Sequence, residues 1–173
     1  MPFIKRFLAL AVFLSLLFIF GCSNDAEENQ INFGLVASEK TLPTDFNEIA
    51  FERSTTPYFQ YLIKKAVNQS EFEEIWNIYG FEKKSSIVDL NEKDVLFIGV
   101  QESGSCPYEI KNINLSSDKK DLRVSLSKPD GACTTDATPR TFVIELDKEV
   151  SKDLKNMIIV ESGTDTTVPI DRN

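Results

Sequence analysis

The three cysteines are the residues of this sequence best suited to specific chemistry. Cys22 follows a small residue at the end of an apolar run, whereas Cys106 and Cys133 lie within a more polar part of the chain. An apolar run of this kind directs export, and exported proteins fold where thiols are oxidised. If Cys22 carries a lipid, Cys106 and Cys133 are the pair that remains, and we predict a disulfide between them.

Two other uses of the pair fit the sequence less well. A redox-active pair normally has the spacing Cys-x-x-Cys, and two thiolates make a poor metal site in a chain without histidine. Free thiols stay open as an alternative to the disulfide. The disulfide would close a loop of about 28 residues and stabilise the fold by roughly 3 to 4 kcal/mol.

The predicted disulfide would bring two polar loops, residues 101–108 and 130–140, to one end of the molecule. Rigid strands would hold these loops, which favours recognition of a partner at low entropic cost. The candidate partner-binding residues, here called the rim, are Glu102, Ser103, Ser105, Tyr108, Thr134, Thr135, Asp136 and Arg140. The alternative is a pair of solvated turns, in which Glu102 or Asp136 simply forms an ion pair with Arg140.

Few patterns point to catalysis or to metal binding, and we assign no catalytic residue, metal or cofactor. The absence of histidine excludes Ser-His-Asp, Cys-His and His-Glu-x-x-His chemistry. Residues 103–105, Ser-Gly-Ser, lack the Gly-x-Ser-x-Gly elbow. A serine–lysine dyad stays open, although no spacing indicates one. A calcium site stays open too, without an EF-hand pattern, at aspartates near turns: Asp118, Asp121, Asp130 and Asp136.

Residues 1–21 have the layout of a secretory signal peptide. Lys5 and Arg6 precede an apolar run, residues 7–20, which is shorter than the roughly 20 residues that a stable membrane span needs. Residues 19–22, Ile-Phe-Gly-Cys, are similar to a bacterial lipobox, which predicts cleavage before Cys22 and lipidation of its thiol. We therefore expect a protein anchored by lipid on the outer side of the cell membrane. A secreted chain and a retained N-terminal anchor are the alternatives.

The charge of the chain argues against a nucleic acid partner. The sequence has 19 basic and 27 acidic side chains, a net charge of -8, and removal of the leader would leave -10. Nucleic acid binding draws much of its energy from basic groups that release counterions. Anionic lipid head groups would also repel such a surface, so the membrane contact is expected from the lipid alone.

The mature chain divides into three parts by composition. Residues 22–44 are mostly polar or acidic and are predicted to form a flexible tether. Residues 45–162 carry the apolar patterns of a single domain. Residues 163–173 are predicted to form a polar, frayed tail.

One amphipathic helix is predicted over residues 70–79. Ser70 and Glu73 have the spacing of a capping box, and Gly80 is suited to the end of a helix. Four large apolar residues share one face at helical spacing, namely Phe72, Ile75, Trp76 and Tyr79. We expect this face to pack on a sheet and the tryptophan to belong to the core rather than to a ligand site.

About seven strands are predicted around this helix: residues 49–53, 58–67, 95–100, 108–115, 122–126, 141–146 and 157–160. This pattern predicts an α+β fold, with a mainly antiparallel β-sheet or sandwich coiled around the helix. The predicted core residues are Phe51, Leu62, Phe97, Ile98, Ile110, Val124, Phe142, Ile144 and Ile159.

Residues 58–160 resemble the C-terminal domain of PrcB-type protease-complex lipoprotein subunits. The resemblance rests on residues 69–76 (Gln-Ser-Glu-Phe-Glu-Glu-Ile-Trp), 94–100 (Asp-Val-Leu-Phe-Ile-Gly-Val), a Gly/Ser turn before Tyr108, and 138–142 (Thr-Pro-Arg-Thr-Phe). Where that family tends to have glycines before the tyrosine, this chain has Ser-Cys-Pro at 105–107. The resemblance implies a small, mostly β, extracytoplasmic domain that binds or assists another protein, and it carries over no catalytic residue.

Together these observations predict a lipid-anchored, non-catalytic domain that contacts a protein or peptide through the rim. Two alternatives stay open. The first is a peptidase inhibitor that presents residues 101–107. The second is a hydrolase or redox accessory enzyme that uses serine, carboxylates or the cysteine pair.

Overall fold

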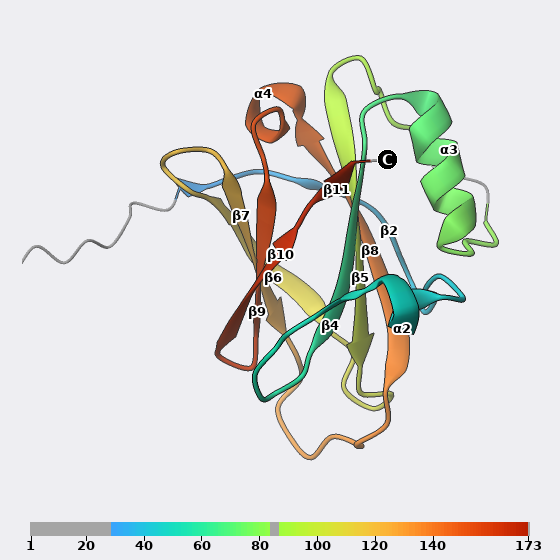
Figure 1. The fold of residues 1–173 in the computed structure, drawn as a ribbon, viewed down its shortest axis with the longest axis vertical. Coiled ribbons are helices and arrows are strands. Elements are labelled where there is room, and N and C mark those ends of the chain that lie inside the picture. The colour runs from blue at the N-terminus through green and yellow to red at the C-terminus, as the bar shows by residue number, and fades with distance from the viewer. Residues whose placement is uncertain (1–28, 84–86, 173) are drawn as a thin grey trace, which may run out of the picture.

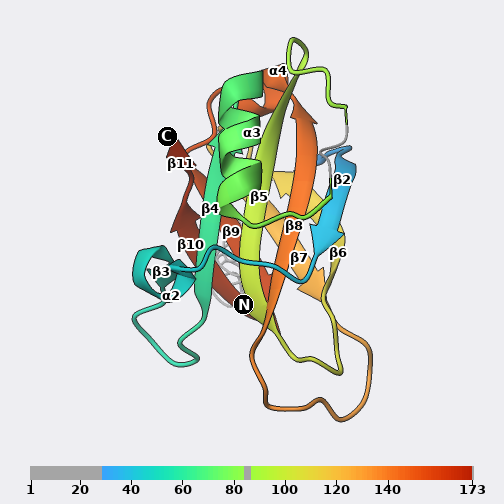
Figure 2. The same ribbon diagram turned by 90° about the vertical axis from the view of Figure 1, so that its right-hand side faces the viewer.

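The computed structural model describes residues 29–83 and 87–172. Two β-sheets face each other, and the longest helix lies against the outer side of one of them (Figures 1 and 2). The predicted leader, the predicted lipidation site Cys22 and the first part of the predicted tether lie outside the described residues.

The first sheet has five strands in the order β1-β6-β7-β9-β10. Its strands are β1 (Asn29–Gln30), β6 (Glu109–Leu115), β7 (Asp121–Ser127), β9 (Asn156–Glu161) and β10 (Thr164–Pro169). The second sheet has six strands, five of them in the order β11-β4-β5-β8-β2, and β3 pairs with β4. Its strands are β2 (Gly34–Glu39), β3 (Phe51–Glu52), β4 (Gln60–Ala66), β5 (Lys93–Glu102), β8 (Thr138–Asp147) and β11 (Asp171–Arg172).

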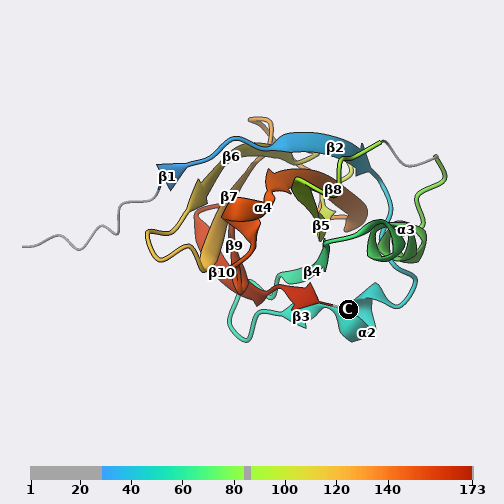
Figure 3. The ribbon, with the colours of Figure 1, turned by 90° about the horizontal axis from the view of Figure 1, so that it is seen from above.

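Most neighbouring strands are antiparallel, and only the pairs β7–β9 and β4–β11 run parallel among the described strands. This arrangement confirms the predicted α+β fold with its mainly antiparallel sheets. The described strands outnumber the seven expected. In the view from above, the chain leaves β10 in the first sheet and enters β11 in the second, so the C-terminal segment joins the two sheets on one side (Figure 3).

The second sheet is covered on both faces, which explains the continuous apolar run of β5. Because side chains alternate along a strand, Leu96 and Ile98 face the first sheet whereas Val95 and Phe97 face the helix. A strand that is buried on both faces has no polar side. The helix therefore lies outside the sandwich, and the sheets are not coiled around it.

Helix α3 (Gln69–Ile78) confirms the predicted helix and its buried face. The indole of Trp76 is 6% exposed and stacks on Phe81 with ring centroids 4.2 Å apart, and its Nε1 donates to the carbonyl of Lys83 at 3.0 Å. Trp76 is thus a core residue, as predicted. Gly80 follows the helix with a φ of 71°, a conformation that glycine adopts without strain.

The predicted capping box of Ser70 and Glu73 is wrong by two residues. Asn68 is the cap: its Oδ1 accepts from the backbone N–H of Glu71 at 3.0 Å, and Glu71 accepts from the Asn68 amide at 2.6 Å and from the N–H of Val67 at 3.0 Å. Asparagine caps a helix as well as serine does, so the helix begins two residues earlier than a cap at Ser70 would place it.

The predicted strand over residues 49–53 is shorter than expected and follows a short helix that includes Ile49. The chain forms α2 (Phe46–Ile49) and then the two-residue strand β3. Phe51 was expected in the core, but it is 38% exposed because β3 lies at the border of the sheet and pairs with β4 alone. The other predicted core residues are buried, apart from the half-buried Ile110.

The predicted tether, residues 22–44, is wrong from residue 29 onward. Strand β2 within it pairs with β8, and Thr41 donates to the carbonyl of Tyr79 at 2.6 Å and accepts from the hydroxyl of Thr141 at 2.5 Å. The strand pairing and these hydrogen bonds hold a segment whose polar composition resembles that of a linker. The domain therefore begins before the predicted boundary at residue 45.

The predicted frayed tail, residues 163–173, is also wrong. Ser162 and Gly163, with φ of 53° and 76°, form a two-residue turn that returns the chain as β10 along β9. Thr166 and Val168 are 4% and 1% exposed, since alternate residues of β10 face the core. The short helix α4 (Lys148–Ser151) precedes this hairpin.

Candidate functional site

The disulfide Cys106–Cys133 is present and confirms the predicted pairing. The two Cα atoms lie 5.6 Å apart, and the bond joins the loop after β5 to the loop before β8. Both loops lie at the same end of the sandwich (Figure 2). The rim residues therefore gather at one place, as the sequence predicts.

Hydroxyl groups and one carboxylate connect the two loops on their exposed side. Ser103 Oγ and Ser105 Oγ lie 3.0 Å and 3.1 Å from Thr134 Oγ1, and the backbone N–H of Thr134 donates to Ser105 Oγ at 2.9 Å. Thr134 also donates to Asp136, which accepts the N–H of Gly104 at 3.2 Å. These hydrogen bonds hold the pKa of Asp136 below its ordinary value.

A buried ion pair joins Glu102, at the end of β5, to Arg140 in β8. Glu102 Oε1 accepts from Nε and Nη2 of Arg140 at 2.9 Å and 2.8 Å, and Glu102 Oε2 accepts from the backbone N–H of Tyr108 at 2.7 Å. The side chain of Glu102 is fully buried and that of Arg140 is 12% exposed. Glu102 was expected on the contact surface, but it can act there only through Arg140.

Tyr108 is fixed by a second buried carboxylate. Its hydroxyl donates to Glu161 Oε1 at 2.6 Å, and the hydroxyl of Tyr61 donates to Glu161 Oε2 at 2.6 Å. Burial raises the pKa of Glu161 despite both hydrogen bonds, and burial next to this carboxylate raises the pKa of both tyrosines. No local sequence pattern indicates Glu161, because its contacts with Tyr61 and Tyr108 join positions far apart along the chain.

A cavity of about 490 Å³ opens beside the rim, between β2 of one sheet and β6 of the other. We call it the β2–β6 cavity. Its lining is mainly apolar and consists of Phe33, Leu35, Ser38, Pro107, Tyr108, Glu109, Ile110, Arg140 and Phe142. Sequence reasoning missed it because Phe33, Leu35 and Ser38 fall in the predicted tether.

The rim thus separates into two layers. Ser103, Ser105 and Asp136 bridge the loops on the outside, and Thr135 is exposed next to them. Tyr108 and Arg140 line the cavity. The arrangement offers hydroxyl and carboxylate groups beside an apolar recess, which suits the recognition of a partner.

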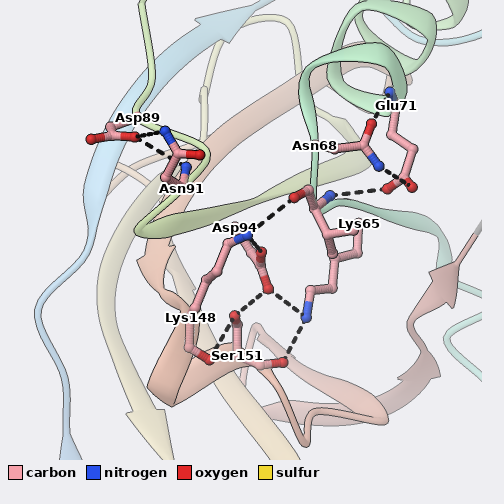
Figure 4. A network of polar contacts seen from close by, with 9 residues as sticks. Lys65, Asn68, Glu71, Asp89, Asn91, Asp94, Lys148 and Ser151 are labelled. Carbon is pink, nitrogen blue, oxygen red and sulfur yellow. Dashed lines mark hydrogen bonds and ion pairs between the residues drawn. The ribbon is translucent and has the colours of Figure 1, made fainter.

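A lysine, an aspartate and a serine meet elsewhere in the molecule, as Figure 4 shows. Lys65 Nζ lies 2.8 Å from Asp94 Oδ2 and 2.7 Å from the carbonyl oxygen of Ser151, whose hydroxyl donates to Asp94 Oδ2 at 2.6 Å. All three residues are at most 4% exposed. The serine proton is therefore directed to a carboxylate in the interior, and the cluster ties α4 to β4 and β5 rather than presenting a nucleophile.

The described part of the chain comprises residues 29–83 and 87–172. There, no group of three or more histidine, cysteine, aspartate or glutamate residues could hold a metal ion. No helix in those residues has the length and apolar character needed to cross a membrane.

Comparisons with family models, with curated proteins and with solved structures gave no match to this chain.

Proposed function

We propose that this protein is a lipid-anchored, non-catalytic binding module on the outer side of a bacterial cell membrane, and that its rim contacts a protein or peptide partner. The observation that carries the proposal is the β2–β6 cavity, an apolar recess that opens beside the disulfide-linked loops. A recess that is lined by apolar side chains and bordered by a few polar groups is the usual form of a binding site.

Preorganisation of the rim supports a role in binding. The disulfide, the hydroxyl network around Thr134 and the buried pair Glu102–Arg140 each restrict the two loops before any partner arrives. Loops that are already ordered lose little entropy on association. Exposed Thr135 and Asp136 remain available at the outer edge.

The anchor is proposed from the sequence. The leader of residues 1–21 and the lipobox-like segment before Cys22 support export and lipidation. Two acyl chains would give durable attachment. The resemblance of residues 58–160 to PrcB-type subunits supports the same environment and an assisting role toward another protein.

The rim can be tested by site-specific photo-crosslinking in intact cells. A photoreactive residue is placed at Pro107, Thr135 or Ala137, which are exposed in the two loops, and at Glu74, which is exposed on α3. We expect a discrete crosslinked product from the three rim positions and none from position 74. The Cys106→Ser/Cys133→Ser variant should reduce the product, because its loops are no longer held together. Identical products from all four positions, or none from the rim, would refute the proposed contact surface.

The anchor can be tested separately by mass spectrometry of the protein from cells. The expected N-terminus is Cys22 with a diacylglyceryl group, and Cys22→Ser should move the protein from the membrane to the soluble fraction. An uncleaved chain with an unmodified Cys22 would overturn the anchoring.

A further inference from the structure

We propose that the β2–β6 cavity binds one large apolar side chain of a peptide segment that carries lysine or arginine next to it. The inference rests on the proposed binding function and adds the chemistry of the partner.

The size and lining of the cavity select an apolar side chain. Phe33, Leu35, Ile110 and Phe142 surround about 490 Å³ together with the ring of Tyr108. Leu35 is 58% exposed, so an occupant would remove it from water. Burying a large apolar side chain is favourable in proportion to the area that it removes from water.

The walls of the cavity are formed before an occupant arrives. The hydroxyl of Tyr108 is bound to Glu161, and Arg140 is held by Glu102 and by the hydroxyl of Ser38, to which Nη1 donates at 3.2 Å. Phe142 is 3% exposed within β8. A preformed recess does not have to be ordered when it is filled.

The charges around the cavity disfavour an anion. Arg140 is the cation among the lining residues, and Glu102 directly behind it compensates its charge. Glu109 lines the cavity as well, Glu161 contacts Tyr108, and the whole chain carries -8. The charge of Lys128 acts on Glu161, and the charge of Lys40 acts on Asp136 in the neighbouring loop. Among the lining residues, a fatty acid or a peptide carboxylate therefore meets no uncompensated positive charge, whereas a basic side chain beside the apolar one would face the exposed carboxylate of Glu109.

Arg140 still has donors for the backbone of a peptide. Its guanidinium carries five N–H groups. Glu102 and Ser38 take three of them among the described residues. A carbonyl oxygen next to the buried side chain could accept from the others, which would fix the direction of the segment.

Peptide binding to the full chain in phosphatidylcholine nanodiscs tests the inference by calorimetry. The probes are acetyl-Lys-Lys-Phe-Lys-Lys-amide, the same peptide with alanine in place of phenylalanine, and acetyl-Glu-Glu-Phe-Glu-Glu-amide. Empty nanodiscs report binding to lipid. We expect the first peptide to bind at least tenfold more tightly than either of the others.

Matched variants locate the site. Leu35→Ser should weaken binding of acetyl-Lys-Lys-Phe-Lys-Lys-amide by at least fivefold. Ile78→Ser, which changes a similarly exposed residue on α3, should leave the affinity for this peptide unchanged. Glu109→Lys should weaken it as well, and Glu74→Lys on α3 should not. Equal affinity for all three peptides, no binding of any, or no effect of Leu35→Ser would overturn the inference. If rim crosslinks persist in cells under any of these results, the proposed function stands and only the ligand chemistry fails.

Discussion

Glu102 and Arg140 form an ion pair across neighbouring strands, in which one carboxylate oxygen accepts from both Nε and Nη2 at 2.9 Å and 2.8 Å. The second carboxylate oxygen accepts the backbone N–H of Tyr108 at 2.7 Å. One buried acidic residue therefore sets the position of two residues that line the β2–β6 cavity.

Arg140→Met should destabilise the fold by about 3–5 kcal/mol, because it leaves the carboxylate of Glu102 buried without a counter-charge. The double variant Glu102→Gln/Arg140→Met should lose much less stability than Arg140→Met, since no buried charge is then left unpaired. Urea denaturation of the purified full chain measures both. A double variant that is as unstable as the sum of the single variants would contradict this account.

The Cys106→Ser/Cys133→Ser variant should lose roughly 3 to 4 kcal/mol of stability, because the bond closes a loop between residues 27 positions apart. Reducing agent should lower the urea midpoint of the wild-type chain to that of the variant and should not change the variant further. A midpoint that is insensitive to complete reduction would show that the loops are held by the other contacts alone.

Glu161→Gln should remove a pH dependence of stability. Burial raises the folded-state pKa of Glu161 above its ordinary value of 4.5, so the folded state holds the proton more tightly than the unfolded state does. This contribution is present below pH 4.5 and is lost as the pH rises through the raised pKa. The unfolding free energy of the Glu161→Gln variant should therefore rise relative to that of the wild type as the pH rises above 4.5.

Denaturation of the wild type and of the variant over pH 4 to 8 measures this difference in unfolding free energy. The pH dependence that comes from the other carboxylates is common to both proteins and largely cancels. The glutamine oxygen can still accept from one tyrosine hydroxyl, so the cluster should be retained. A difference that stays constant with pH, or that moves in favour of the wild type, would refute a raised pKa at Glu161.

Gly104→Ala should release Asp136 from its contacts, because a Cβ at residue 104 would overlap the aspartate carboxylate. The pKa of Asp136, which Thr134 and the N–H of Gly104 hold below its ordinary value of 3.8, should then rise toward that value. A titration of carboxyl carbons by NMR follows the change. Asp118, whose pKa is lowered by Ser116 and Lys120, is the internal control and should not move.

Local patterns made the helix and the disulfide predictable. The face of α3 depends only on the spacing of residues within ten positions, and the buried Trp76 follows from it. The pairing of Cys106 with Cys133 follows from counting thiols once export and lipidation of Cys22 are predicted. The position of the rim at one end of the molecule is then predictable too, because the disulfide brings its two loops together.

The cavity and the buried polar clusters were not predictable in the same way. Strand β2 lies in a segment of polar composition, and its place is set by pairing with β8, about a hundred residues later. Glu161 and Lys65 have side chains that are normally exposed, and both are buried by contacts with residues about 30 to 100 positions away. A sequence window of a few residues holds no information on such partners.

Adjacent lysines on β4 provide the sharpest test of the interior network. Lys65 is 2% exposed and contacts Asp94 and the carbonyl of Ser151, whereas Lys64 pairs with the exposed Asp171. Lys65→Met should cost about 3–5 kcal/mol, because it leaves Asp94 buried with only the Ser151 hydroxyl and a cation 3.8 Å away on Lys148. Lys64→Met should cost no more than about 1 kcal/mol, as expected for a pair at the surface. Urea denaturation separates the two variants, and equal losses would show that the Lys65–Asp94–Ser151 cluster does not stabilise the fold.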